Sequence, residues 1–159
     1  MWASLSLWLL WLLACWLLFR LGLVVWPDVA CEDFLTDFIA DRLGNAAYQY
    51  RLFTNNHTPG TGSLIGDFTE ATFGGYAPIS GATIVWSAPT LAGHIAQSTG
   101  SNIVFTNTSG GSVTVYGVFV TDATGTILYF AERDPNAPIT ILNGGNYVYT
   151  PNQQYKSIN

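Results

Sequence analysis

The chain has 159 residues, which is enough for one domain with a substantial core and too few for two well-packed ones. Charged residues make up only 9% of it and the formal net charge is −5, against roughly 25% charged residues in ordinary soluble domains. The few cations are spread along the chain and form no basic cluster that could follow a phosphate backbone, so we expect no nucleic-acid partner.

Residues 1–26 are almost wholly apolar. Leu5–Phe19 is shorter than the roughly 20 residues that span a bilayer, whereas Leu5–Trp26 is long enough if Arg20 reaches toward the interface. No positively charged start precedes the run, as a signal peptide would have. The piece Leu12–Cys15 resembles a bacterial lipobox, which would place a lipid on its cysteine.

Three interpretations of this apolar run remain open. It is a membrane or signal segment, a buried helix, or the product of a start codon assigned too far upstream, with the protein beginning near Leu23–Val25. The two cysteines, Cys15 and Cys31, cannot form a disulfide framework for a domain that follows them, so we expect both to be reduced.

Residues 27–45 are predicted to form an amphipathic helix. Asp28 is the expected N-cap and Gly44 the expected C-terminal stop. Apolar side chains recur on one face at three- and four-residue spacing: Cys31, Phe34, Leu35, Phe38 and Ile39. An acidic stripe lies on another face: Asp33, Asp37 and Asp41. Such a stripe is far more often a solvated face than a cation site.

From residue 46 to residue 150 the pattern changes to short β-strands separated by turn-rich segments. The predicted strands are 48–53, 83–86, 102–106, 113–121, 126–131, 139–142 and 147–150. Residues 92–101 are expected to be a Gly/Ser/Thr connection, and residues 151–159 a polar tail. The spacing predicts a mainly β fold: an antiparallel β-sandwich or jelly-roll-like domain with an N-terminal helical segment.

The hairpin formed by 113–121 and 126–131 is the expected centre of that domain. Its first strand is apolar on both faces, which is typical of a strand in the middle of a covered sheet. Asp122 can bond to the backbone of the connecting loop and Gly125 can supply a positive φ, so we predict a short turn with a glycine bulge.

No set of residues predicts an active site. His57 and His94 lie in polar connections, and no further ligands at matched spacing accompany them, so both are expected to be surface loop residues. The glycine-rich pieces GTGSLIG and SGGS lack the lysine and the strand-to-helix context of phosphate loops. A glycosidase would need two carboxylates that converge across a cleft, and Glu70 with Glu132 is the least poor pair.

The remaining polar motifs have simple structural interpretations. Glu132–Asp134 is expected to be an ion-pair cluster at the end of the hairpin, and calcium at Asp122 or Asp134 has no loop motif behind it. Asn56 and Asn107 each begin an N-glycosylation pattern, which matters only in a host that glycosylates. We therefore predict no catalytic, cofactor-binding or metal-binding residues, no cofactor and no enzyme activity.

The expected surface is rich in Thr, Ser, Asn and Tyr and poor in charge. Hydroxyls and amides make many uncharged hydrogen bonds, and tyrosine adds apolar area at low entropic cost, which suits adhesion and assembly. An equally good interpretation is that these side chains simply keep a secreted or viral β-protein soluble.

Four pieces of the chain form an ordered set of motifs. They are Val24–Val29 before a short apolar helix, Tyr50–Asn56 followed by Thr58-Pro59, Gly66–Phe73 with Gly75–Ala77, and Tyr116–Asp122 with Leu128–Arg133. In this order, from about Leu23 to Thr150, the set resembles small structural proteins of tailed bacteriophages, of the tail-fibre or virion type. The resemblance implies a compact β-domain that serves as a virion component, with no catalytic residues to carry over. Residues 1–22 depart from the family's pattern, which favours the upstream-start interpretation.

Our first hypothesis is therefore a structural virion protein that acts in assembly or surface attachment. Its expected partners are other copies of itself and other virion proteins, with host-surface glycans as a further candidate and membrane contact left open. The alternative is a membrane-anchored or lipidated, exported β-sandwich used for adhesion, and a carbohydrate-active enzyme is a distant third.

Overall fold

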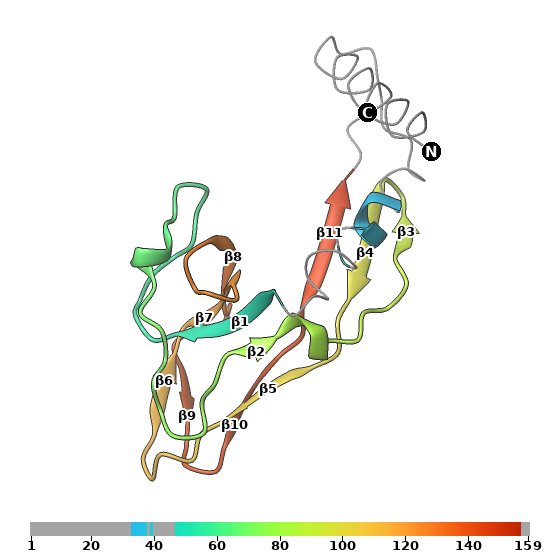
Figure 1. Cartoon of the computed structure of the whole chain (residues 1–159). Coiled ribbons are helices and arrows are strands. Elements are labelled where there is room, and N and C mark those ends of the chain that lie inside the picture. The colour runs from blue at the N-terminus through green and yellow to red at the C-terminus, as the bar shows by residue number, and fades with distance from the viewer. Residues whose placement is uncertain (1–32, 38, 40–46, 157–159) are drawn as a thin grey trace, which may run out of the picture.

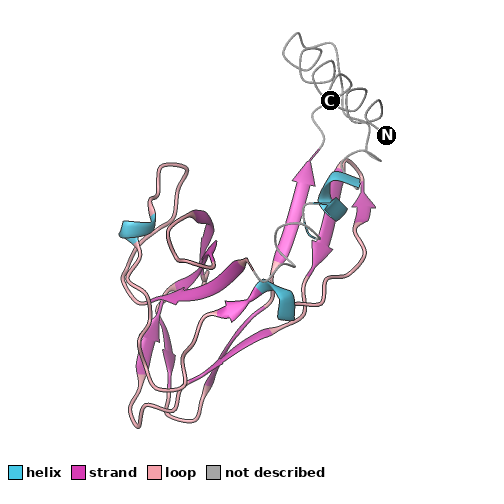
Figure 2. Ribbon diagram, in the orientation of Figure 1, coloured by secondary structure: helices cyan, strands magenta, loops and turns pink. Residues whose placement is uncertain are grey.

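The structure is a computed structural model that describes residues 33–37, 39 and 47–156. Within them the chain is mainly β, with several antiparallel sheets and only short helical pieces (Figures 1 and 2). The strands are β1 (Tyr48–Phe53), β2 (Ile79–Ser80), β3 (Thr90–Ala92), β4 (Ile95–Thr99), β5 (Ile103–Thr106), β6 (Val113–Val115), β7 (Gly117–Asp122), β8 (Leu128–Arg133), β9 (Ile139–Ile141), β10 (Asn146–Tyr149) and β11 (Asn152–Lys156). The 3-10 turns are η2 (Ile65–Asp67) and η3 (Gly81–Thr83), and residues 33–37 are helical.

Four sheets arise from antiparallel pairing. The largest has the strand order β2-β1-β7-β8, and a second has the order β11-β4-β3. Two pairs, β10-β5 and β6-β9, complete the described part of the chain. Phe53 pairs with Gly117 and Tyr48 with Asp122, so β1 runs along the whole length of β7.

The main core lies between one face of the four-stranded sheet and the two strand pairs. Alternate residues of β1 and β7 face it, as period-two geometry requires. From these two strands it takes Tyr48, Tyr50, Leu52, Val118 and Val120. From the two strand pairs it takes Ile103, Phe105, Val115, Ile141 and Tyr147. These buried aromatic and branched side chains hold the two layers together.

The opposite face of the same sheet is also covered. Phe53 of β1 and Phe119 of β7 are buried there against Phe68, which the loop after β1 brings back onto the sheet. The Phe68 ring stacks on Phe119 with centroids 5.3 Å apart and meets Phe53 edge-on at 5.2 Å. The expectation that the central strand is buried on both faces is confirmed for β7, whose first five residues are all buried.

The predicted strand 113–121 is in fact two strands that belong to different sheets. β6 pairs with β9, whereas β7 pairs with β1 and β8. The chain changes sheets at Tyr116-Gly117, where a Cβ on Gly117 would lie 2.1 Å from the carbonyl oxygen of Glu132. Only glycine permits this approach. The change of sheet explains why Val115, Val118 and Val120 share one core although strict alternation would separate them.

The hairpin turn has the predicted chemistry with later boundaries. Gly125 has φ +72°, and its N–H donates to the carbonyl of Asp122 at 3.0 Å. The second strand begins at Leu128 rather than Thr126. The register shifts after Val120, because Val120 pairs with Phe130 and Thr121 with Leu128, so the bulged residue is Tyr129 and not the glycine.

A long ribbon runs from the main core toward one end of the molecule, where β4 and β5 pair with β11 and β10 (Figure 1). Between the paired stretches, residues 100–102 face residues 150–151, so one side carries one residue more. Because of this bulge, the even-numbered residues Ala96 and Ser98 are buried in β4, whereas the odd-numbered residues Ile103 and Phe105 are buried in β5.

Several predicted boundaries differ from the structure. Residues 83–86 contain no strand, only the end of η3 and an isolated bridge from Trp86 to Gly100. The expected connection 92–101 contains β4, and the expected tail 151–159 contains β11. The apolar run 1–26 and most of the predicted helix 27–45 lie outside the described residues; Asp33–Asp37 is helical, as predicted.

Among residues 33–37, 39 and 47–156, no helix is long and apolar enough to cross a membrane.

Candidate functional site

The sheet β11-β4-β3 extends away from the main core together with the helical residues 33–37, and we call these elements the arm (Figure 1). Its own core is small. Among the described residues it consists of Leu35, Ile39 and Ala96, with the half-buried Trp86 packed against them.

Cross-strand register places one row of side chains under the helical segment. Leu91 of β3, Ala96 of β4 and Tyr155 of β11 are directly opposite one another and so lie on one face. The Tyr155 ring also meets the ring of Phe34, with centroids 4.8 Å apart. Leu91, Tyr155 and Phe34 each keep about two fifths of their surface exposed (38%, 42% and 40%). These three side chains are the apolar patch of the arm.

The next row of the arm sheet is polar and uncharged. Thr90, Gln97 and Gln154 are directly opposite one another, on the face away from Ala96. Within the described residues, β3 and β11 each have a strand partner on one side only. Unpaired N–H and C=O groups of edge strands are a template for pairing with another chain. The arm is therefore suited to binding protein by strand addition.

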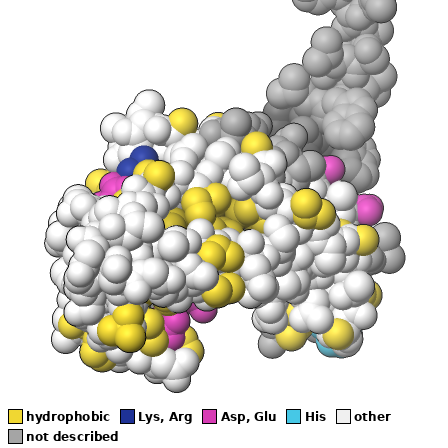
Figure 3. Space-filling view, turned by 90° about the horizontal axis from the view of Figure 1, so that it is seen from below, with side chains coloured by type: hydrophobic (Ala, Val, Ile, Leu, Met, Phe, Trp, Pro, Cys, Tyr) yellow, Lys and Arg dark blue, Asp and Glu magenta, His cyan; other side chains and the backbone are white. Residues whose placement is uncertain are grey.

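Much of the surface shares this neutral character. In Figure 3 most exposed atoms are uncharged polar side chains or backbone, and few charged side chains appear. The described residues contain one salt bridge, between Arg51 and Glu70.

That salt bridge belongs to a network beside β1. Arg51 Nη1 lies 2.7 Å from Glu70 Oε2, and Arg51 Nε donates to Thr121 Oγ1 at 3.0 Å. The hydroxyl of Tyr76 donates to Glu70 Oε1 at 2.8 Å and accepts from the N–H of Leu52 at 3.2 Å. Burial of Tyr76, and secondarily its hydrogen bond to Glu70, raises the pKa of its hydroxyl well above the usual range.

The two carboxylates that a glycosidase would need are not brought together. Glu70 bridges to Phe53 beside β1, whereas Glu132 lies on β8, and β7 separates β1 from β8. Glu70 lies on the side of β1 away from β7, so three strand spacings separate the two residues, which amounts to about 14 Å. Glu132 instead accepts a hydrogen bond from the Tyr149 hydroxyl at 2.9 Å.

The expected ion-pair cluster Glu132–Asp134 is wrong as well. Asp134 Oδ2 accepts from the Tyr147 hydroxyl at 3.0 Å. Arg133 Nη1 donates to the carbonyl of His57 at 3.0 Å, and its guanidinium lies 5.1 Å from the centre of the Tyr116 ring. Arg133 therefore contacts His57 and Tyr116 rather than its acidic neighbours Glu132 and Asp134. The hydrogen bond to His57 anchors the loop after β1 to β8.

The structure places both histidines in turns. His94 is exposed in the connection between β3 and β4. His57 Nε2 lies 3.1 Å from Ser63 Oγ, and its ring meets Phe68 edge-on at 4.9 Å. Ser63 Oγ also accepts the N–H of Gly60 at 2.9 Å. The His57–Ser63 contact closes residues 57–63 of the loop after β1, and no carboxylate is hydrogen-bonded to this histidine in the described part of the chain.

Asp122 organises the hairpin turn through its carboxylate. Oδ1 accepts the N–H groups of Thr126 and Ile127 at 2.7 and 2.8 Å, and Oδ2 accepts the hydroxyls of Thr124 and Thr126. The hydrogen bonds from Thr124 and Ile127 hold the pKa of this carboxyl well below its usual range. Residues 33–37, 39 and 47–156 contain no group of three or more His, Cys, Asp or Glu side chains that could hold a metal ion.

The two glycosylation patterns have opposite surroundings. Asn107 is fully buried, and its Nδ2 donates to the carbonyls of Gly111 and Ile141 at 2.7 and 2.9 Å. Its Oδ1 accepts from the backbone and the hydroxyl of Ser109. Both amide hydrogens are thus in use in the folded chain. Asn56, in contrast, is exposed in the loop after β1.

The sequence predicted the helical residues 33–37 of the arm but none of its three strands. The alternation Ile95-Ala96-Gln97-Ser98-Thr99 is a period-two signal, and it was outweighed by the neighbouring glycines and the polar composition. β11 is polar apart from Tyr155 and shows no signal of its own. Its pairing with β4 is a long-range contact that composition does not reveal.

Comparisons with models of known protein families, with curated proteins and with solved structures found no match to this chain.

Proposed function

We propose that this protein is a structural component of a tailed-phage virion that acts in assembly or surface attachment and carries out no catalysis. The arm carries the assembly part of the proposal. Its outer strands β3 and β11 each have an edge with no described strand partner, and its surface carries a row of uncharged polar side chains and an exposed apolar patch. Its own core is small and leaves this apolar patch exposed.

The partners proposed for the arm are other copies of this chain and, through them, other virion proteins. Strand addition between identical edges is self-complementary, which favours closed homo-oligomers. We further propose that the main body is an antiparallel β-sandwich. The two layers that enclose Tyr50, Phe105 and Val120 support this interpretation.

The virion assignment itself is supported by the ordered motifs that resemble phage structural proteins and by the neutral surface. The test is to purify particles from the native source through a density gradient and to identify the chain in them by mass spectrometry. The proposal requires the chain to sediment with the particles and to be absent from the detergent-extracted membrane fraction. Recovery only from membranes would contradict it and would favour an anchored adhesion domain, exported rather than in the virion.

A charge on the arm tests the assembly part. Leu91→Lys places an ammonium group in the apolar patch, where association would have to desolvate it, whereas Thr61→Lys adds the same charge to an exposed loop. Sedimentation velocity at micromolar concentration should show an oligomer for the unmodified chain and for Thr61→Lys, and dissociation for Leu91→Lys. A monomeric unmodified chain, or no effect of Leu91→Lys, would rule out assembly through the arm.

A further inference from the structure

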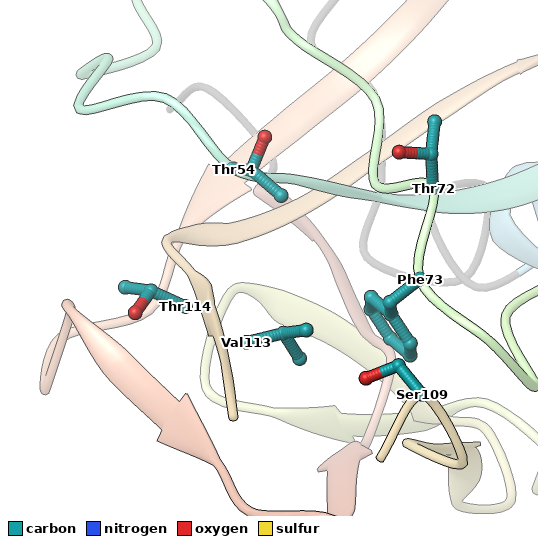
Figure 4. A pocket seen from close by; sticks show the side chains of 6 residues that line it. All are labelled: Thr54, Thr72, Phe73, Ser109, Val113 and Thr114. Atoms are coloured by element: carbon teal, nitrogen blue, oxygen red, sulfur yellow. The ribbon is translucent and has the colours of Figure 1, made fainter. Parts of the chain in front are cut away.

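A solvent-open pocket of about 460 Å³ lies in the main body, where four stretches of chain meet. Thr54 follows β1, Thr72 and Phe73 belong to the segment before β2, Ser109 lies in the turn after β5, and Val113 and Thr114 begin β6 (Figure 4). In the view of Figure 4 Ser109 lies beside the Phe73 ring, Thr114 lies beside Val113, and Thr54 and Thr72 lie above them.

The apolar part of the pocket is fixed from behind. Phe73 and Val113 both pack against the main core. The Phe73 ring lies 5.3 Å from that of Tyr76, which in turn stacks on Phe105 at 5.8 Å. An aromatic ring and a branched side chain are therefore held in place before any ligand arrives, so binding would require little ordering of the floor.

The turn that carries Ser109 is equally constrained. Its N–H and hydroxyl both donate to the buried Asn107 Oδ1, at 2.9 and 2.6 Å. The N–H of Thr108 donates to the carbonyl of Gly74 at 2.7 Å, and a Cβ on Gly74 would approach the Ser109 Cα to 3.1 Å. The turn after β5 and the segment of Phe73 are thus fastened together, which sets the width of the pocket.

The polar groups of the rim are uncharged and in part unused. Thr72 and Thr114 are exposed, and their hydroxyls have no hydrogen-bond partner in the described part of the chain. Thr54 donates to the carbonyl of Thr69 at 3.2 Å, and its oxygen keeps acceptor capacity. No lining side chain carries a charge.

We propose that this pocket binds a neutral saccharide, one pyranose unit of a surface glycan. A pyranose presents C–H groups on its faces and hydroxyls around its edge. The C–H faces suit the Phe73 ring and Val113. The sugar hydroxyls suit the exposed hydroxyls of Thr72 and Thr114, which can both donate and accept, and the remaining acceptor capacity of Thr54. Phosphorylated, sulfated and sialylated ligands do not fit, because the lining offers no cation to neutralise them. The inference deepens the attachment half of the proposed function and rests on it.

Saturation-transfer NMR and titration of amide shifts test the proposal on the full chain. The probes are the methyl glycosides of glucose, galactose, mannose and N-acetylglucosamine, with sialyllactose and galactose 6-sulfate as charged counterparts. We expect at least one neutral glycoside to bind, with a dissociation constant on the order of 1 mM, as for a small ligand in an open site. Shift changes should centre on Phe73, Val113 and Thr114.

Two variants probe the pocket, so that the test survives if one of them fails to fold. Thr114→Val removes an exposed hydroxyl at constant shape, and Phe73→Leu keeps an apolar side chain while removing the ring. Each should weaken binding about three- to tenfold, whereas Thr61→Val, an exposed threonine of the loop after β1, should leave it unchanged.

The proposal would be overturned if none of the four neutral probes bound at a concentration about 20-fold above the expected dissociation constant. Stronger binding of a charged probe, or an unchanged constant in Thr114→Val, would overturn it too. None of these outcomes bears on the arm, because the oligomer and particle measurements use different variants, so the two proposals fail separately.

Discussion

Arg51 and Glu70 form an ion pair with Nη1 and Oε2 2.7 Å apart, and this contact fastens the end of the long loop after β1 to β1 itself. The Arg51 side chain is 14% exposed and that of Glu70 34% exposed, so water screens the pair only in part. Thr121 supplies a third member from β7, because its hydroxyl accepts from Arg51 Nε. The network therefore joins two strands and a loop.

Replacing Arg51 alone should lower the free energy of unfolding more than replacing both Arg51 and Glu70. Arg51→Met leaves the half-buried Glu70 carboxylate without its cation, and we expect a loss of about 1–3 kcal/mol in the free energy of unfolding. The double variant Arg51→Met/Glu70→Gln should recover part of that loss, since no charge remains unpaired. Urea denaturation of both variants measures the difference; equal losses would show that solvent screens the pair completely.

Two buried tyrosine hydroxyls should respond in opposite directions to removal. The hydroxyl of Tyr50 is buried and has no hydrogen-bond partner among the described residues, whereas that of Tyr147 donates to Asp134. We therefore expect Tyr50→Phe to stabilise the fold by up to about 1 kcal/mol and Tyr147→Phe to destabilise it by about 1 kcal/mol. Thermal denaturation of the pair checks this, and a destabilised Tyr50→Phe would indicate a water-mediated partner.

The buried tyrosine hydroxyls lead us to expect a loss of stability at alkaline pH. Burial raises the pKa values of Tyr50, Tyr147 and Tyr149 above their usual value near 10, with carboxylates adding to the effect at the last two. The folded pKa values of these hydroxyls exceed the unfolded ones, so the fold favours their neutral form. The stability that these neutral hydroxyls contribute is complete below pH 10 and is lost as the pH rises above it. Tyrosinate absorbance near 295 nm should therefore rise together with loss of near-ultraviolet circular dichroism. Full tyrosinate absorbance, equal to that of the unfolded chain at the same pH, in a chain that keeps its dichroism would contradict the prediction.

The sequence predicted β1 at its observed boundaries and β7 as a strand buried on both faces, since the alternating and continuous apolar patterns there are strong. It also predicted the turn at Gly125, where positive φ is needed. It did not predict the separation of β6 from β7. Composition cannot show that Gly117 is required by contact with Glu132, because that contact is created by the pairing with β8.

The candidate site was less predictable than the core. β3 and β11 are short or polar, and they become strands only because β4 offers them both of its edges. The pocket likewise gathers Thr54, Thr72 and Thr114 from distant parts of the chain. Isolated threonines in loops carry no local signal, so only the fold reveals that they line one pocket.

Gly117 offers a strict test of the point where the chain changes sheets. Gly117→Ala would place a methyl group 2.1 Å from the Glu132 carbonyl oxygen and 2.8 Å from the Phe53 ring, so strands β7 and β8 would have to move apart. We expect a loss of at least about 3 kcal/mol or failure to fold. Gly111→Ala, where a Cβ would meet nothing within 4 Å, is the matched control. Similar urea midpoints for both variants would show that the chain does not pass close to the Glu132 carbonyl at Gly117.

Removal of β11 should separate the stability of the arm from that of the main body. Without residues 152–159, β4 loses one strand partner and Tyr155 no longer meets Phe34, so the small cluster around Ala96 opens to water. The main core contains no residue of β11.

Hydrogen exchange should therefore show fast exchange of the Ala96 and Ser98 amides in the shortened chain and continued protection of Val118 and Val120. Removing only residues 157–159, which leaves β11 intact, should preserve protection at all four positions. Continued protection of Ser98 without β11 would mean that β3 and the segment around Trp86 suffice to hold β4. Loss of protection at Val118 would mean instead that arm and body unfold as one unit, because the long ribbon formed by β4, β5, β10 and β11 transmits the damage.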